Sequence, residues 1–270
     1  MVENPGYKPA WQVFQNVGAQ LIPITVDSEG LCIEAIKDAL KQHPNIKALY
    51  TTPHHQYPTT VTLTLQRRME LILLSNNYGF NIIEDDYDHE FHFGHRPVLP
   101  LCSFPGIENY IYMGTLSKIV APALRISYLV SSREQIQKVA ALRKLIDVQG
   151  DTIMEKAVLQ LIQDGEIKRH LKRATVLYKN KRDYFEQVVQ QYLGDKVHFT
   201  KPEGGLAFWL VPHQKTDSST WNKQLLEQKF QIILPEKFSY DNPLNGLRLG
   251  YASLMDSQLE DSIRAIATLF

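Results

Sequence analysis

Two short apolar runs, each followed at once by a cluster of polar side chains, constrain this chain more than any other feature. The first reads I-I-E-D-D-Y-D from Ile82 to Asp88, and the second reads I-Y-M-G-T-L-S-K from Ile111 to Lys118. Such runs are typical of buried parallel strands, whose carboxyl ends open onto ligand sites. The pattern predicts an α/β fold with a binding site where these two strands end.

The polar cluster of the first run contains two neighbouring aspartates that should face opposite ways. In a strand, side chains alternate with a period of two, so Ile83, Asp85 and Tyr87 share one face. Asp86 points to the other face. We therefore expect Asp85 and Tyr87 to line the site together, although composition alone equally allows a solvated acidic turn.

An amine, two hydroxyls and a guanidinium group follow the second run. It ends in Thr115, Ser117 and Lys118, and Arg125 comes seven residues later. A lysine amine can form a Schiff base with an aldehyde such as pyridoxal phosphate (PLP), and hydroxyls with an arginine suit a phosphate dianion. A carboxylate keeps the pyridine nitrogen protonated, and a phenol can hydrogen-bond the ring oxygen. We therefore expect Lys118 to be a buried amine, kept unprotonated by desolvation and a nearby cation.

Four motifs occur in a fixed order along the chain. They are T-P-H-H-Q-Y-P-T from Thr52, E-D-D-Y-D-H-E-F from Glu84, G-T-L-S-K from Gly114 and A-P-A-L-R-I-S-Y from Ala121. They resemble those of fold-type I PLP-dependent aminotransferases and, more narrowly, of the aminotransferase-like domain of MocR-type regulators in the GntR superfamily. The resemblance implies an α/β large domain with a mainly parallel sheet, residues 1–166. A long linking helix and a smaller α+β C-terminal domain, residues 167–270, would follow.

The resemblance also implies roles for individual residues. Lys118 would form the Schiff base, or internal aldimine, with PLP. The other expected contacts are Asp85 to the pyridine nitrogen, Tyr87 to the ring oxygen, Tyr7 stacked on the ring, Thr115, Ser117 and Arg125 to the phosphate, and Arg248 of L-R-L-G-Y to the substrate carboxylate. No metal ligand is implied.

The chain also departs from the family pattern. Aminotransferases commonly carry an asparagine where this chain has Tyr57, and a glycine where it has Thr60. His54 and His55, just before, could be solvated loop residues or cofactor contacts. Arg96, in the loop after Phe91, is expected to be structural. The Gly-rich turn that usually binds the phosphate would precede Met1, so we expect the N-terminal part of the domain to be missing.

Composition narrows the function classes. The chain has 29 basic and 29 acidic residues, so no overall field would attract nucleic acid. DNA binding would require an N-terminal winged-helix domain outside these residues. Its two cysteines provide no metal-ligand spacing and fit a reducing cytosol. No apolar run approaches the roughly 20 residues of a membrane span, so we expect a cytoplasmic protein.

Apolar spacing predicts alternating strands and helices, as in a parallel sheet with helical crossovers. The smaller domain should contain a hairpin-like segment and further strand pieces. The predicted helices are residues 10–18, 31–42, 65–77, 167–192, 219–229 and 256–270, and residues 133–164 show a helical pattern throughout. The predicted strands include residues 21–26, 47–52, 197–199, 204–211, 232–235 and 247–251.

Three functions remain open from the sequence. The first is an effector-sensing domain that holds PLP on Lys118 and binds a small amino compound, within a bacterial transcription regulator. The second is a free-standing PLP-dependent aminotransferase acting on an amino acid and a 2-oxo acid, in which Lys118 would shuttle a proton. The third is a degenerate remnant that binds little PLP. In each, the resemblance implies a homodimer.

Overall fold

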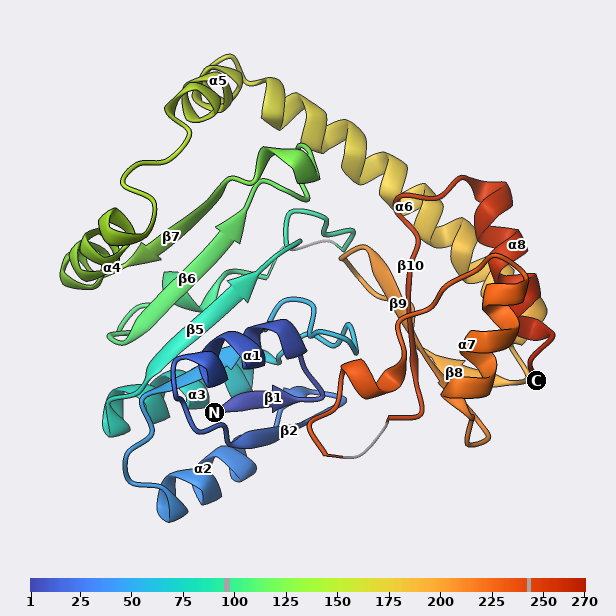
Figure 1. The fold of residues 1–270 in the computed structure, drawn as a ribbon, viewed down its shortest axis with the longest axis horizontal. Coiled ribbons are helices and arrows are strands. Elements are labelled where there is room, and N and C mark those ends of the chain that lie inside the picture. The colour runs from blue at the N-terminus through green and yellow to red at the C-terminus, as the bar shows by residue number, and fades with distance from the viewer. Residues whose placement is uncertain (95–97, 242–243) are drawn as a thin grey trace.

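Two β-sheets organise the chain in the computed structural model, which describes residues 1–94, 98–241 and 244–270 (Figure 1). Arg96, expected to be structural, lies outside these residues. The larger sheet has seven strands in the order β3-β2-β1-β4-β5-β6-β7, and the smaller has three in the order β10-β9-β8. A long helix, α6 (Glu166–Leu193), runs from the large sheet's side of the molecule to the small sheet.

The large sheet is mainly parallel, which confirms the predicted fold class. Its strands are β1 (Val2–Asn4), β2 (Pro23–Asp27), β3 (Gly30–Leu31), β4 (Ala48–Thr51), β5 (Asn81–Asp86), β6 (Tyr110–Thr115) and β7 (Ser127–Ser131). The edge strands β3 and β7 pair antiparallel to their neighbours, and the five strands between them are parallel. The carboxyl ends of the parallel strands therefore meet at one edge of the sheet, as ligand sites in such folds require.

Helices cover both faces of the large sheet. Helices α2 (Ile33–Gln42) and α3 (Leu65–Tyr78) pack on one face, in a core that contains Ile36, Leu71 and Ile82. Helix α1 (Lys8–Asn16) packs on the other, where Trp11 joins Val2 and Tyr50. Helix α3 ends at Gly79, which has a φ of 69°, a left-handed conformation that residues with a side chain adopt only with strain. The chain then turns directly into β5.

One predicted helical stretch is two helices. Helices α4 (Arg133–Ile146) and α5 (Thr152–Gln163) are separated at residues 147–151, where Val148 has a φ of 58°. Each has its own N-cap: Ser132 accepts a hydrogen bond from Gln135 N, and Asp151 accepts one from Met154 N. Helix α4 lies beside β7, and α5 lies beside the start of α6, both away from the small sheet (Figure 1). Large apolar side chains are exposed on both.

The small sheet packs against α6, α7 (Ser218–Glu227) and α8 (Asp256–Ala267). Its strands β8 (Val197–Phe199), β9 (Ala207–Pro212) and β10 (Leu247–Gly250) are antiparallel. The predicted strand at residues 232–235 is wrong. That segment pairs with no described strand and leads into the short 3-10 helix Pro235–Lys237, because proline cannot continue a ladder of hydrogen bonds. Two further 3-10 helices are Leu101–Ser103 and Pro122–Leu124.

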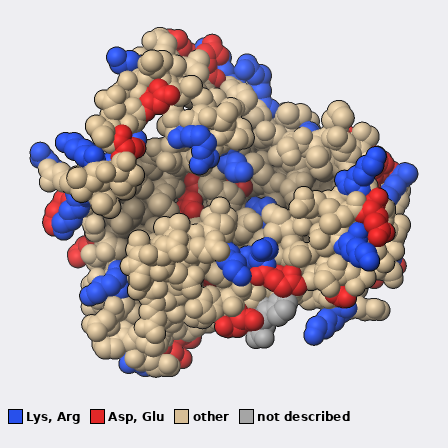
Figure 2. Space-filling model, in the orientation of Figure 1, with Lys and Arg blue, Asp and Glu red and all other residues tan. Residues whose placement is uncertain are grey.

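The surface carries no single dominant charge. Figure 2 shows Lys and Arg side chains interspersed with Asp and Glu over the visible face. Among the described residues, no helix combines the length and the apolar character that crossing a membrane would take.

Candidate functional site

The two aspartates of β5 face opposite sides of the large sheet. The Tyr50 hydroxyl, on β4, donates a 2.5 Å hydrogen bond to Asp85 Oδ2. The Tyr112 hydroxyl, on β6, donates a 2.8 Å bond to Asp86 Oδ2. Tyr50 packs with the α1 cluster, so Asp85 lies on the α1 face of the sheet. Burial raises the pKa of the Asp85 carboxyl, and the bond from Tyr50 opposes that rise.

Asp86 is held in a buried network of histidines. His54 Nδ1 lies 3.3 Å and His89 Nδ1 lies 2.8 Å from Asp86 Oδ2. Burial alone would raise the pKa of the Asp86 carboxyl, but the two histidines hold it below its ordinary value. His55 is buried too, with its Nδ1 2.7 Å from Asp88 Oδ1. The reading of His54 and His55 as solvated loop residues is therefore wrong, because both are buried against carboxylates.

Tyr87, which follows β5 of the large sheet, meets Arg248 on β10 of the small sheet. The Tyr87 hydroxyl donates a 2.7 Å hydrogen bond to the His55 carbonyl, and Arg248 Nη2 donates a long 3.4 Å bond to the same hydroxyl. The Arg248 guanidinium carbon lies 4.7 Å from the centre of the Tyr57 ring. Arg248 Nε is buried and has no hydrogen-bond partner among the described residues. A partly buried guanidinium whose buried Nε donor is unused is suited to an incoming carboxylate.

Aromatic rings connect this arginine to the N-terminal segment. The rings of Tyr7 and Tyr57 meet edge to face at 5.1 Å, and those of Tyr57 and Tyr87 at 6.4 Å. Tyr7 is partly exposed, with 38% of its surface accessible. The fold thus brings Tyr7, Tyr87 and Arg248 together around Tyr57, the residue that departs from the family asparagine.

The expected phosphate residues follow β6. Asp85 pairs in register with Met113, so Thr115, two residues further, lies on the same sheet face as Asp85. Thr115 Oγ1 accepts a 3.1 Å hydrogen bond from Ser117 N, which shapes the turn that carries Lys118. Gly114 is needed in this strand, since a Cβ there would lie 2.2 Å from Tyr128 Cζ.

Lys118 and Arg125 differ from the sequence expectation. Lys118 is exposed, so the prediction of a buried amine is wrong for the chain as described. The residue lies in a turn at 117–120 beyond the end of β6, where no described segment covers it. Arg125 is also exposed, in the left-handed conformation with a φ of 50°. No hydrogen bond or ion pair joins either side chain to another described residue.

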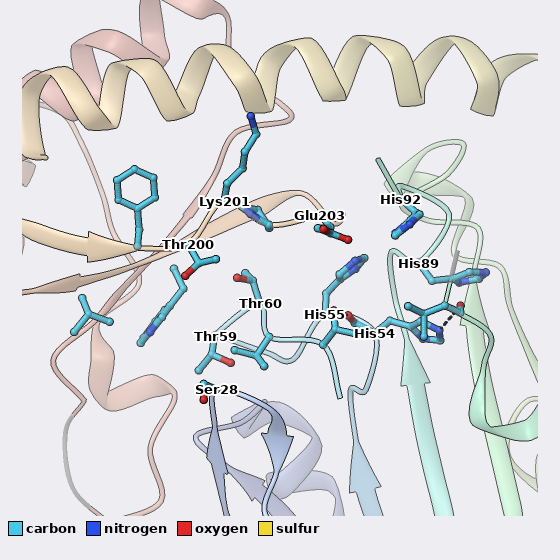
Figure 3. Close-up of a pocket in the computed structure, with 18 of the residues that line it drawn as sticks. Ser28, His54, His55, Thr59, Thr60, His89, His92, Thr200, Lys201 and Glu203 are labelled. Atoms are coloured by element: carbon cyan, nitrogen blue, oxygen red, sulfur yellow. Dashed lines mark hydrogen bonds between the residues drawn. The ribbon is translucent and has the colours of Figure 1, made fainter. Parts of the chain in front are cut away.

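Two cavities of about 410 Å³ lie outside the expected set of residues. The first opens between the two sheets and is lined by His54, His55, His89 and the segment that leads into β9 (Figure 3). The second lies beside β1 and includes Tyr50 and Ile83. None of the eight expected site residues lines either cavity. No group of His, Cys, Asp and Glu within the described ranges could hold a metal ion.

Sequence reasoning missed two residues that support this site. Tyr50 was placed only in a predicted strand, and Glu3 was given no role. Glu3 is buried and accepts hydrogen bonds from Thr51 Oγ1 and Gln56 Nε2. No local signal pairs Tyr50 with Asp85, because the register of Tyr50 against Ile83 is set by the pairing of β4 with β5. For Glu3, no signal in the local sequence separates a buried carboxylate from a solvated one.

Comparison with known proteins gives this geometry a family. The model of the aspartate aminotransferase family matches residues 1–218. The chain belongs to that family. It is 26% identical, over 99% of its length, to aromatic-amino-acid aminotransferase 1 of Thermococcus litoralis. It is 32% identical, over 98% of its length, to YdeL of Bacillus subtilis, an uncharacterized HTH-type transcriptional regulator.

A solved structure shares the fold of this family member closely. The kynurenine aminotransferase of Pyrococcus horikoshii, determined with PMP, superposes with a TM-score of 0.93 at 27% identity. The match covers 99% of this chain and 68% of that one. The fold is therefore that of the fold-type I aminotransferases. The chain spans 65% of the Thermococcus relative and 56% of YdeL, so both relatives are considerably longer.

Proposed function

We propose that this chain is the PLP-binding, aminotransferase-like domain of a bacterial transcription regulator and senses a small amino compound. The observation that carries the proposal is the contact between Tyr87 and Arg248, which come from the two sheets, just beyond the end of the strand β5 that carries Asp85. Regulator rather than enzyme is favoured by the H-Q-Y-P-T and E-D-D-Y-D motifs and by the 32% identity to YdeL.

We propose that the following residues would hold the cofactor. The Lys118 amine would condense with the cofactor aldehyde and release water. Asp85 would hold the protonated pyridine nitrogen, and Tyr7 would stack on the ring. The Tyr87 hydroxyl would donate to the ring oxygen in place of the His55 carbonyl, to which it donates in this structure. When bound, PLP supplies an electron sink for the α-carbon of the amino compound. The phosphate contacts we propose are Thr115, Ser117 and Arg125.

The exposed Lys118 and Arg125 have a consequence for this proposal. Both lie in the segment between β6 and β7, and β7 is an edge strand whose apolar side chains are exposed on both faces. We propose that additional polypeptide covers this segment and buries the lysine amine. Desolvation would then favour the unprotonated form, which is the nucleophile.

Arg248 would select compounds that carry a carboxylate. Its guanidinium rests on the Tyr57 ring and has a buried, unused Nε donor. A carboxylate could accept two parallel hydrogen bonds from it, replacing the long bond to Tyr87. An amino acid is therefore the favoured effector class. The proposed division has residues 1–166 bind the cofactor and residues 167–270 supply Arg248.

The same surface supports a homodimer. Leu145, Ile146 and Ile153 are 83%, 76% and 82% exposed, the first two on α4, which packs against β7, and the third on α5. Apolar patches of this extent mark protein interfaces. We propose that a second copy of the protein packs here, that DNA is bound only by an N-terminal winged-helix domain, and that the protein works in the cytoplasm without membrane contact.

A second candidate is a free-standing aminotransferase. It is favoured by the TM-score of 0.93 and 27% identity to the kynurenine aminotransferase. In that case Lys118 would move a proton at the α-carbon of the amino acid. Turnover distinguishes the two functions: an enzyme consumes an amino acid and a 2-oxo acid continuously, whereas a sensor binds the amino compound without net transfer.

The decisive experiment is borohydride reduction of the protein with PLP, followed by peptide mapping. We expect the cofactor to be trapped on Lys118 and lost in Lys118→Ala. Asp85→Asn should weaken PLP binding by about tenfold or more, because a hydrogen bond between charged groups is lost. Asp86→Asn, on the opposite sheet face, is the matched control. Trapping on another lysine, or equal effects of the two substitutions, would refute the site.

A further inference from the structure

Tyr50 is fixed in place beside Asp85. It lies on β4 and pairs in register with Ile83 of β5, so its side chain and that of Asp85 project from the same sheet face. Tyr50 is only 2% exposed, and its ring meets that of Phe14 from α1 at 5.8 Å. A ring clamped between a sheet and a helix has little rotational freedom. Its hydroxyl is therefore a fixed donor.

The Tyr50 hydroxyl is the hydrogen-bond donor to the Asp85 carboxylate. It donates a 2.5 Å hydrogen bond to Asp85 Oδ2, a length typical of a bond to an ionised acceptor. Within residues 1–94, 98–241 and 244–270, no other group hydrogen-bonds to Asp85. One oxygen is thus occupied by Tyr50, and Oδ1 is left for a different donor.

We propose that Tyr50 is a positioning residue: its hydroxyl holds Asp85 ionised and turns Oδ1 toward the pyridine nitrogen of the cofactor. This inference rests on the proposed function, since it assumes that Asp85 holds that nitrogen. A pyridinium needs an ionised carboxylate, because a neutral acid provides no charge to stabilise it. Tyr50 therefore acts on the cofactor through Asp85 without touching it.

The surrounding charges make such a donor necessary. Burial raises the pKa of the Asp85 carboxyl, and the nearby carboxyl groups of Asp86 and Asp88 raise it further. The bond from Tyr50 is the opposing influence. Burial also raises the pKa of the Tyr50 phenol, as do Asp85, Glu3 and Tyr7, so the phenol keeps its proton and remains a donor. The pair therefore consists of a neutral phenol and a carboxylate that it stabilises.

The sheet provides a matched control for this pair. On its other face, Tyr112 donates an equivalent bond to Asp86. Tyr50→Phe and Tyr112→Phe each remove one hydroxyl from a buried tyrosine next to an aspartate and keep the ring that packs. General loss of stability would affect both variants, whereas the proposed role distinguishes them.

The first measurement uses the PLP-free protein. Carboxyl carbons are followed by NMR during a pH titration, with Asp85→Asn used to assign the Asp85 signal. In Tyr50→Phe, the ionisation constant of Asp85 should fall about tenfold or more, because a hydrogen bond to a charged group is lost. In Tyr112→Phe it should remain unchanged. An Asp85 titration that does not move in Tyr50→Phe overturns the inference.

The second measurement is PLP affinity, followed by the absorbance of the bound cofactor. Tyr50→Phe should raise the Kd about tenfold, and Tyr112→Phe should not. If Asp85→Asn weakens PLP binding but Tyr50→Phe does not, the role of Tyr50 is refuted and the proposed site stands. If the Asp85 titration shifts in Tyr50→Phe but neither Tyr50→Phe nor Asp85→Asn weakens PLP binding, Asp85 does not hold the cofactor. Both proposals then fail.

Discussion

Glu3 should make the stability of this protein fall as the pH rises from about 4.5 to about 7. Its carboxyl group is buried and accepts hydrogen bonds from Thr51 Oγ1, Thr52 N, Thr52 Oγ1 and Gln56 Nε2. Burial raises its pKa from 4.5 to about 7, although these hydrogen bonds favour the ionised form. Glu3 lies four residues before Tyr7, and its carboxylate is hydrogen-bonded by Gln56, the residue before Tyr57.

The sign follows from proton linkage. Between about pH 4.5 and pH 7 the folded protein keeps a proton on Glu3 that the unfolded chain has released. The stabilisation is therefore complete below pH 4.5 and is lost as the pH rises to about 7. The difference between these two pKa values corresponds to about 3 kcal/mol of unfolding free energy.

The assay is urea unfolding of the wild type and Glu3→Gln across this pH range. Subtracting the two stability curves removes the contributions of other titrating groups. The difference should change by about 3 kcal/mol in favour of Glu3→Gln as the pH rises. Glu227→Gln, at an exposed glutamate, is the control and should give a flat difference. A flat difference for Glu3→Gln would refute the reasoning.

Three further substitutions test the structure. Thr60→Gly should raise the unfolding free energy by about 1 kcal/mol, because Thr60 has a φ of 63° that glycine adopts freely. The control Thr59→Gly, which removes the hydrogen bond from the Thr59 hydroxyl to Gln56, should lower it. Lys118→Ala should abolish borohydride trapping of PLP. It should change the unfolding free energy by less than about 0.5 kcal/mol, because the Lys118 side chain is exposed, and a large loss of stability in urea would contradict that exposure. Arg68→Met should lower the unfolding free energy, measured in urea or by heating, by about 3 kcal/mol or more, because the Arg68 guanidinium donates hydrogen bonds to three backbone carbonyls. The control is Arg169→Met, at an exposed arginine, and an equally small effect of both substitutions would contradict this prediction.

Much of the architecture follows from local pattern. Short apolar runs alternating with helical spacing predict a mainly parallel sheet, because burial on both faces requires apolar strands. The period of two in β5 predicts that Asp85 and Asp86 face opposite ways, as their tyrosine partners show. The pattern over residues 133–164 predicts helix but not its interruption, since the conformation of Val148 leaves no mark on apolar spacing.

The sequence by itself determined which chemical groups gather at the ends of β5 and β6, because residue order and strand period are properties of the chain. The tertiary structure decided what each group touches. Tyr50 reaches Asp85 across 35 positions, and His54 is buried against Asp86, through strand pairings that no local pattern encodes. The exposure of Lys118 is likewise tertiary, since burial depends on which distant segments pack over a residue.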